Sequence, residues 1–283
     1  MDKHDVTLVN DDFTDVTLPQ ARLIAALDSD PAPRAGPPRI IISLDVTTSM
    51  GEYLASRKLT LEAARHIVLP MFENAGAAGL EVQFIYFRGD DRYPNKPREC
   101  RASKWFRDPE ELARAMAAVE HWPGWTQHNR VLQHVLRQAE KGPVHELVII
   151  TDAFEQRGLR RPDGDSLDEA CMDAMRLRRL GTKITAAYKG SIRGGCPLDR
   201  AGVSAEQAFR VIAEDNNGAC FLYKPGDPNV TKQFGELAAH AALQAKGDAA
   251  GAKVLLEHLQ SVPFTMDPVG EQVPSDRCKQ ENL

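Results

Sequence analysis

Residues 39–49 read Arg39-Ile40-Ile41-Ile42-Ser43-Leu44-Asp45-Val46-Thr47-Thr48-Ser49. The part up to Leu44 is almost entirely apolar, which is typical of a β-strand that is buried on both faces. The part after it places one carboxylate and two hydroxyls at alternate positions, Asp45, Thr47 and Ser49. Because alternate residues of an extended chain point the same way, these three side chains can face one ion. Oxygen ligands of this kind suit a small divalent cation such as Mg²⁺.

Apolar strands and amphipathic helices alternate along the chain after residue 38. Apolar runs predict strands at 40–44, 80–87, 147–150, 183–188 and 219–223, with a short edge strand near 103–106. Helical spacing of apolar residues, with cap residues and glycines at the ends, predicts helices at 56–74, 108–120, 127–141, 166–180, 204–216, 229–245 and 249–260. Such alternation is typical of parallel sheets, so we predict an α/β, Rossmann-like fold with a mostly parallel central sheet and helices on both faces.

Three segments of different character divide the 283 residues. Residues 1–38 are predicted to be an N-terminal extension, in which apolar residues between Val6 and Leu18 favour short strands before a proline-rich stretch. Residues 39–245 carry the alternating pattern and form the predicted domain. Residues 246–283 are predicted to be a C-terminal helix followed by a flexible tail, since polar residues and prolines accumulate toward the end of the chain.

The composition argues against several classes of protein. The 35 basic and 40 acidic side chains give a net charge of −5, whereas nucleic-acid binders usually have a basic excess. The sequence contains neither the apolar core of a signal peptide nor an apolar run long enough to span a bilayer. The five cysteines include no Cys-x-x-Cys pair, which indicates reduced thiols. We therefore expect a cytoplasmic protein that binds neither nucleic acid nor membrane.

Polar residues follow two of the predicted strands at the point where each strand ends. Asp45 follows the strand at 40–44, and Asp152 follows the strand at 147–150. Ligands of open α/β sheets bind beyond the carboxyl ends of the strands, so both carboxylates are expected at one edge. A turn that ends in Thr126, Gly124-Trp125-Thr126, lies between two predicted helices and is expected to reach the same edge.

With these residues in place, the sequence resembles a von Willebrand factor A domain that carries a metal-ion-dependent adhesion site (MIDAS). The family motif is Asp-x-Ser/Thr-x-Ser after the first strand, a Thr in a Gly-rich turn, and an Asp after the fourth strand. The sequence matches all five positions, with Asp45, Thr47, Ser49, Thr126 and Asp152. The resemblance covers about residues 39–245. It departs from the family at Trp125, where a second Gly is common, and this makes the turn bulkier.

The resemblance implies a bound Mg²⁺ or Mn²⁺ with one open coordination position that an acidic side chain of a partner protein can fill. It implies a non-enzymatic adaptor or scaffold, as in intracellular bacterial members that work beside AAA+ ATPases or in multiprotein stress and defence systems. Three further residues are candidates for contact with the partner, because they lie near the same edge: Trp122, Trp125 and Glu155.

Two alternatives remain open. The first is a Mg²⁺-dependent phosphohydrolase of the haloacid-dehalogenase type, which also places an Asp after its first strand. That chemistry needs a second acid two residues later, and Thr47 occupies this position. The second is a structural subunit whose metal site is vestigial. The glycine-rich motif of dehydrogenases, the P-loop and the Gly-x-Ser-x-Gly motif of hydrolases are missing from the first strand–helix turn.

Overall fold

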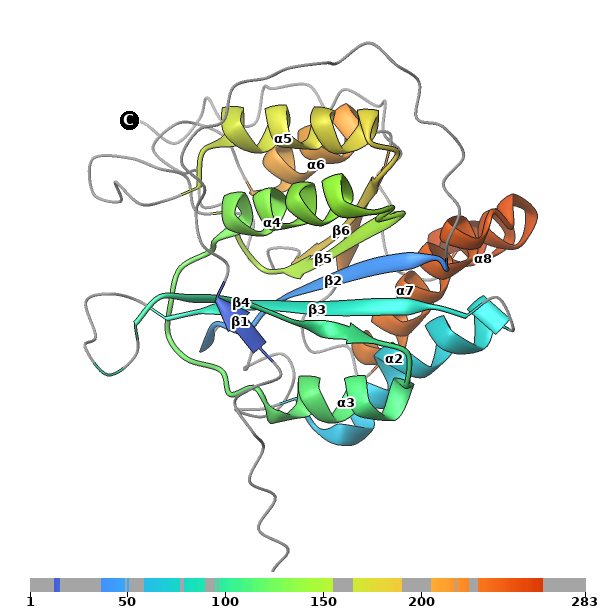
Figure 1. The fold of residues 1–283 in the computed structure, drawn as a ribbon, viewed down its shortest axis with the longest axis horizontal. Helices are drawn as coiled ribbons and strands as arrows, with labels where there is room; N and C mark the ends of the chain where they lie inside the picture. Colours follow the sequence, from blue (N-terminus) through green and yellow to red (C-terminus); the bar gives the residue numbers. More distant parts are fainter. Residues whose placement is uncertain are drawn as a thin grey trace, which may run out of the picture.

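A seven-stranded sheet runs through the centre of the molecule in the order β1-β4-β3-β2-β5-β6-β7 (Figure 1). The computed structural model describes residues 13–15, 37–48, 50, 59–76, 79–89, 95, 97–154, 165–189, 205–216, 218–223 and 229–261. The strands are β1 (Phe13–Asp15), β2 (Arg39–Asp45), β3 (Glu81–Arg88), β4 (Glu99–Phe106), β5 (Glu146–Thr151), β6 (Lys183–Lys189) and β7 (Ala219–Tyr223).

The sheet is mostly parallel. β2 pairs in parallel with β3 and with β5, and the parallel pairing continues through β6 to β7. β4 is antiparallel to β3, and β1 is antiparallel to β4, so the antiparallel strands lie at one side of the sheet. The predicted α/β fold with a mostly parallel central sheet is confirmed.

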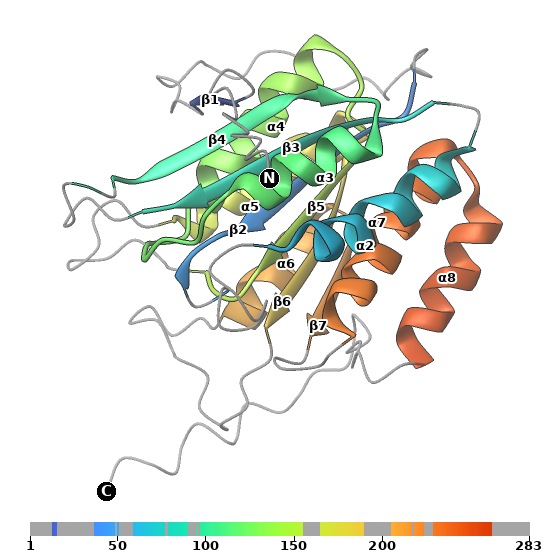
Figure 2. The same cartoon turned by 90° about the horizontal axis from the view of Figure 1, so that it is seen from below.

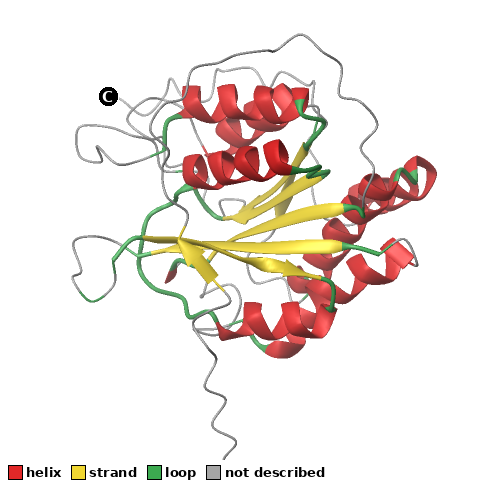
Figure 3. Ribbon diagram, in the orientation of Figure 1, coloured by secondary structure: helices red, strands yellow, loops and turns green. Residues whose placement is uncertain are grey.

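Helices cover both faces of the sheet (Figures 1 and 3). One face carries α2 (Leu61–Ala75), α3 (Pro109–Ala118), α7 (Val230–Lys246) and α8 (Ala249–Ser261). The opposite face carries α4 (His128–Lys141), α5 (Leu167–Arg179) and α6 (Ala205–Asn216). The view in Figure 2 shows α8 outside α7 and α2, as an outer layer on its face. The structure is therefore a three-layer sandwich with an additional helix on one side.

The apolar run of β2 explains why it lies at the centre of the sheet. Ile40 and Ile42 belong to the core on the α2 and α7 face, and Ile41 belongs to the core on the α4 face. All three side chains are fully buried. Burying one such side chain contributes roughly 1.5–3 kcal/mol, so a central strand that is apolar on both sides stabilises both layers.

Local sequence signals fix where helices begin. The Asp108 side chain caps α3 by accepting hydrogen bonds from the N–H groups of Glu110 and Glu111 at 2.7 and 3.0 Å. Pro109 occupies the first helical position, where its missing N–H costs nothing. Ser166 caps α5 in the same way. These starts agree with the sequence prediction to within one residue.

Other boundaries differ from the prediction. β4 begins at Glu99 instead of near residue 103, because polar and apolar residues alternate in its first half and this half carries no apolar run. Phe13–Asp15 of the N-terminal extension form β1 and add to the sheet. The helix predicted at 56–74 begins only at Leu61, because Thr60 has an extended backbone and caps the helix by accepting a hydrogen bond from the N–H of Ala63 at 3.1 Å.

Within residues 13–15 and the described parts of 37–261, no helix combines the length and the apolar character that crossing a bilayer requires.

Candidate metal centre

The first loop of the candidate site begins at Asp45, the last residue of β2, which is fully buried. Its carboxylate oxygen Oδ1 accepts a hydrogen bond from the backbone N–H of Thr47 at 2.8 Å. The other oxygen, Oδ2, accepts a hydrogen bond from the hydroxyl of Thr151 at 3.0 Å, across 106 residues of sequence. Donors from two loops therefore fix the carboxylate where the neighbouring strands β2 and β5 end.

A second carboxylate, that of Asp152, lies close enough to act on Asp45. Burial raises the pKa of Asp45 well above its ordinary value, and the charge of Asp152 raises it further. Hydrogen bonds from Thr47 and Thr151 lower this pKa and so oppose both effects. Two carboxylates in a poorly solvated site repel each other, and a bound cation relieves this repulsion.

The second loop of the site, which carries Trp122, Trp125 and Thr126 between α3 and α4, lies directly against the ends of β2 and β3. Thr47 forms an isolated parallel bridge with Trp122, whose N–H donates to a carbonyl of the first loop at 3.1 Å. The N–H of Trp125 donates to the carbonyl of Gly89, just after β3, at 3.2 Å. These contacts place Thr126 at the same edge of the sheet as the first loop, as the sequence predicts.

The Thr126 side chain is held by a residue from outside the three predicted loops. Its hydroxyl donates a hydrogen bond to Oδ2 of Asp165 at 2.9 Å. The same Oδ2 accepts the backbone N–H of His128 at 3.0 Å, and Oδ1 accepts the N–H of Asn129 at 2.9 Å. Thr126 and Asp165 are 2% and 3% exposed, so bulk water hardly reaches this contact.

The third loop follows β5 and connects to the second through His128. The ring nitrogen Nε2 of His128 lies 2.9 Å from the carbonyl oxygen of Ala153, so Nε2 is the protonated nitrogen. The ring packs against three aromatic side chains at centroid distances of 5.0–5.4 Å: Phe87, Phe154 and Phe209. Burial lowers the pKa of His128, so this residue is a neutral, fully buried connector between loops.

Trp122 and Trp125, the two candidate partner contacts on the second loop, are both half-buried. The guanidinium of Arg88 lies 3.8 Å from the centre of the Trp122 ring, and its Nε forms an ion pair with Glu99 at 3.1 Å. Trp122 therefore packs against the Arg88 guanidinium and helps to hold the second loop in place. The role of Trp125 in partner binding stays a prediction.

The structure brings four of the predicted metal ligands to one edge. Asp45, Thr47 and Asp152 lie on the first and third loops, and Thr126 lies on the second. The predicted ligand Ser49 and the predicted partner contact Glu155 lie outside the described residues.

Sequence reasoning missed two residues that shape the site. Thr151 belongs to the predicted third loop, but its hydrogen bond to Asp45 depends on the register of β2 against β5. Asp165 lies 39 residues after Thr126, and its position before a helix indicates only an ordinary helix cap. No periodic or motif signal predicts the hydrogen bond of Thr151 or connects Asp165 to the site.

The chemistry of the donor atoms decides which ion fits. The four described candidates offer carboxylate and hydroxyl oxygens and no sulfur or imidazole nitrogen, which is the preference of Mg²⁺ and Mn²⁺. Among the residues that the structure describes, no cluster of three or more His, Cys, Asp or Glu side chains could hold a metal ion.

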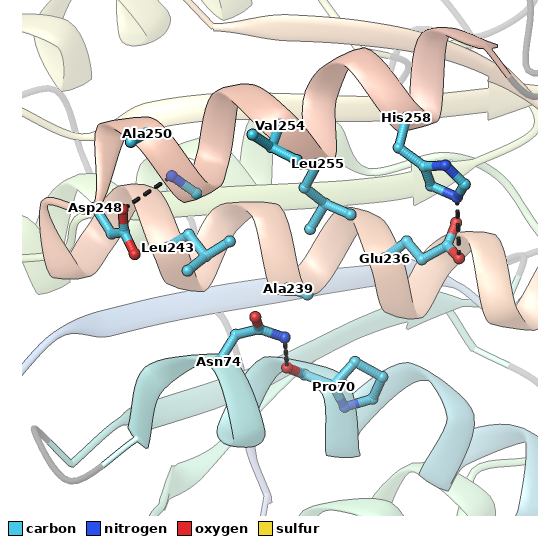
Figure 4. Close-up of a pocket in the computed structure, with 11 residues that line it drawn as sticks. Pro70, Asn74, Glu236, Ala239, Leu243, Asp248, Ala250, Val254, Leu255 and His258 are labelled. Atoms are coloured by element: carbon cyan, nitrogen blue, oxygen red, sulfur yellow. Dashed lines mark hydrogen bonds and ion pairs between the residues drawn. The ribbon is translucent and has the colours of Figure 1, made fainter.

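A separate groove of about 770 Å³ lies between α2, α7 and α8 (Figure 4). Apolar residues such as Leu243, Val254 and Leu255 line it, and the imidazole of His258 faces Glu236 at 3.7 Å at one end. None of the candidate metal ligands lines this groove.

Comparison with known proteins finds solved structures whose fold is similar to that of this chain but whose sequence identity to it is low. No family model matches the chain, and no curated protein matches it. The von Willebrand factor type A structure from Catenulispora acidiphila is 14% identical, with a TM-score of 0.50 over 74% of this chain and 43% of that one. The von Willebrand factor domain of the type V pili tip protein Mfa5 from Porphyromonas gingivalis is 13% identical, with a TM-score of 0.49 over 76% of this chain and 97% of that one.

The chain spans less than half of the length of the Catenulispora acidiphila structure. Within the matched part, the likeness agrees with the observed sheet, whose parallel strands are flanked by helices on both faces. At 14% identity it shows the fold alone, and the fold of this chain is that of a von Willebrand factor A domain.

Proposed function

We propose that the protein is a non-enzymatic adaptor that binds a partner protein through a Mg²⁺ or Mn²⁺ site. The observation that carries the proposal is the buried Asp45 carboxylate, which lies beside Asp152 and accepts hydrogen bonds from Thr47 and Thr151. The pair offers negative charge at the edge of the sheet where ligands of this architecture bind.

The side chains of the site have different tasks. Asp45 and Asp152 supply charge, and hydrogen bonds to the protein hold the Asp45 oxygens in place. Thr47, Ser49 and Thr126 supply neutral hydroxyl oxygens. A divalent ion held mainly by hydroxyls would keep much of its positive charge and attract a carboxylate of the partner.

The partner would approach the rim formed by the second and third loops. Trp125 on the second loop is half-buried and can add contact area, because Trp is enriched at the centres of protein interfaces. Trp122 and Glu155 complete the proposed rim. A role beside an AAA+ ATPase or in another multiprotein system, in the cytoplasm, is part of the same proposal.

Phosphohydrolase chemistry is a weaker candidate on the geometry of Asp45. A nucleophilic carboxylate must approach the phosphorus atom, yet Asp45 is fully buried and both oxygens accept hydrogen bonds from the protein. Thr47 also replaces the acid that would protonate the leaving group. A structural subunit with a vestigial site differs from the proposed adaptor in one measurable respect, since it would bind its partner equally well without metal.

The test measures metal binding and the open coordination position together. Mn²⁺ is titrated into the protein and followed by electron paramagnetic resonance, and acetate is then added while the relaxation of its methyl protons is recorded. We expect bound Mn²⁺ to relax acetate in the wild-type protein and much less in a Thr47→Val variant. Wild-type protein that binds no Mn²⁺ would overturn the proposal, and Mn²⁺ that acetate does not reach would overturn carboxylate docking.

A further inference from the structure

We infer that Asp165 is a positioning residue that holds the Thr126 hydroxyl in the orientation required of a metal ligand. The inference rests on the proposed metal site, because Thr126 is one of its ligands. Asp165 itself lies outside the motif residues, and its position in the sequence gives it no place in the site.

The first step concerns the single proton of the Thr126 hydroxyl. A hydroxyl can donate one hydrogen bond and accept two, and a cation can only be bound by its lone pairs. The Thr126 proton is donated to Oδ2 of Asp165 at 2.9 Å. The lone pairs of Thr126 are therefore directed away from Asp165.

The second step concerns what holds Asp165 in place. Its two oxygens accept the N–H groups of His128 and Asn129 in the first turn of α4. These groups have no partner within the helix, and the N-terminus of a helix favours a negative charge. Gln127 at the cap position makes no side-chain cap bond, so Asp165 supplies the cap from a distant part of the chain.

The third step concerns the backbone next to Asp165. The side chain of Asn129 accepts the N–H of Ser166 at 2.7 Å and donates to the Ser166 carbonyl at 3.2 Å. The segment at 165–166 is thus attached to α4 by contacts that do not involve Thr126. Asn129 therefore helps to fix the segment that carries Asp165.

Partners that orient metal ligands typically change metal affinity about 10–100-fold when they are mutated. We therefore expect Asp165→Ala to weaken Mn²⁺ binding about tenfold or more, since the freed Thr126 proton can then point toward the ion. Thr126→Val also weakens binding, but Asp165→Ala adds little in the Thr126→Val background, because the group on which Asp165 acts is gone.

The experiment measures Mn²⁺ affinity by electron paramagnetic resonance for the wild type, both single variants and the double variant. The midpoint of thermal unfolding without metal is recorded in parallel. Thr182→Val is the control, since it removes a buried hydroxyl that donates to the Val144 carbonyl and that touches neither Thr126 nor the 165–166 segment. This control should lower the midpoint and leave the affinity within about twofold of the wild type.

The outcomes separate the two proposals. If the wild type binds Mn²⁺ and Asp165→Ala binds it equally well, the positioning role is wrong and the metal site stands. The same conclusion follows if Asp165→Ala lowers the Mn²⁺ affinity by the same factor in the wild-type and in the Thr126→Val background. If the wild type binds no Mn²⁺, both proposals fail. Should Asp165→Ala not fold, Asp165→Asn enters the same cycle, because it keeps the shape of the side chain and removes its charge, and the same non-additivity is expected.

Discussion

Gly124 lies so close to Gly89 that a Cβ atom at residue 124 would come within 2.3 Å of the Gly89 backbone nitrogen. The contact joins the second loop of the candidate site to the end of β3, where the Trp125 N–H also donates to the Gly89 carbonyl. Real Cβ atoms do not approach backbone this closely, so only glycine lets the loop rest at this depth. The Gly-rich turn that the sequence offers is therefore a requirement of packing.

The first prediction follows from this contact. Gly124→Ala should force the second loop away from β3, lower the free energy of unfolding by about 1–3 kcal/mol, and weaken metal binding through displacement of Thr126. Denaturant unfolding and Mn²⁺ titration measure the two effects. Gly142→Ala is the control, since its Cβ would meet only the end of the flexible Arg39 side chain at 3.0 Å. Equal behaviour of the two variants would contradict the argument.

The second prediction concerns the hydroxyl of Thr47. Thr47→Val keeps the shape of the side chain and removes one oxygen ligand, so Mg²⁺ affinity measured by titration calorimetry should fall about tenfold or more. Thr182→Val provides the comparison, because Thr182 is also buried and donates its hydroxyl to the Val144 carbonyl far from the site. That variant should lose stability and keep its affinity. Unchanged affinity in Thr47→Val would remove Thr47 from the ligand set.

The third prediction concerns removal of the metal. A ligand that binds only the folded state at 100 times its Kd stabilises that state by about 2.7 kcal/mol. For a domain of this size, we therefore expect EDTA to lower the midpoint of thermal unfolding by roughly 5–10 °C relative to saturating Mg²⁺. The shift should shrink strongly in Thr126→Val. A shift of the same size in that variant would place the ion elsewhere.

The fourth prediction concerns pH and the fully buried Glu146. Burial raises the pKa of Glu146 from 4.5 to about 7, although hydrogen bonding from Thr185 and the charge of Lys183 lower it. Between these two pH values the folded state binds more protons than the unfolded state, so stability falls as the pH rises from about 4.5 to about 7. The change amounts to about 3 kcal/mol, at about 1.36 kcal/mol for each pKa unit.

Glu146→Gln tests this assignment, because the amide has nearly the same shape and does not titrate. Denaturant unfolding at a series of pH values should show a smaller fall in stability for the variant than for the wild type over that range. His134 and His240, whose pKa values burial lowers to about 4, contribute in the opposite direction in both proteins. Parallel pH curves for variant and wild type would show that Glu146 is not the titrating group.

The parts of the fold that depend on local pattern could be predicted. The apolar runs at β2 and β5 determine central, doubly buried strands, and the rule that ligands bind beyond their carboxyl ends brings Asp45 and Asp152 together. The first half of β4 could not be predicted, because an outer strand with a half-exposed face has no continuous apolar run.

The parts of the site that depend on long-range contact could not be predicted either. Thr126 and Asp165 meet only after α4 packs on the sheet and the chain returns to the start of α5. His128 appears in the sequence as a polar residue of a first helical turn. Its burial depends on three aromatic side chains that lie on β3, in the third loop and on α6.

β1 pairs only three residues with β4, yet it changes what that side of the molecule presents to other proteins. Without it, the backbone of Arg101, Ala102 and Ser103 would offer unsatisfied amide and carbonyl groups to any extended peptide. A shortened protein that begins at residue 37 would expose this edge of β4, and we expect it to self-associate more readily.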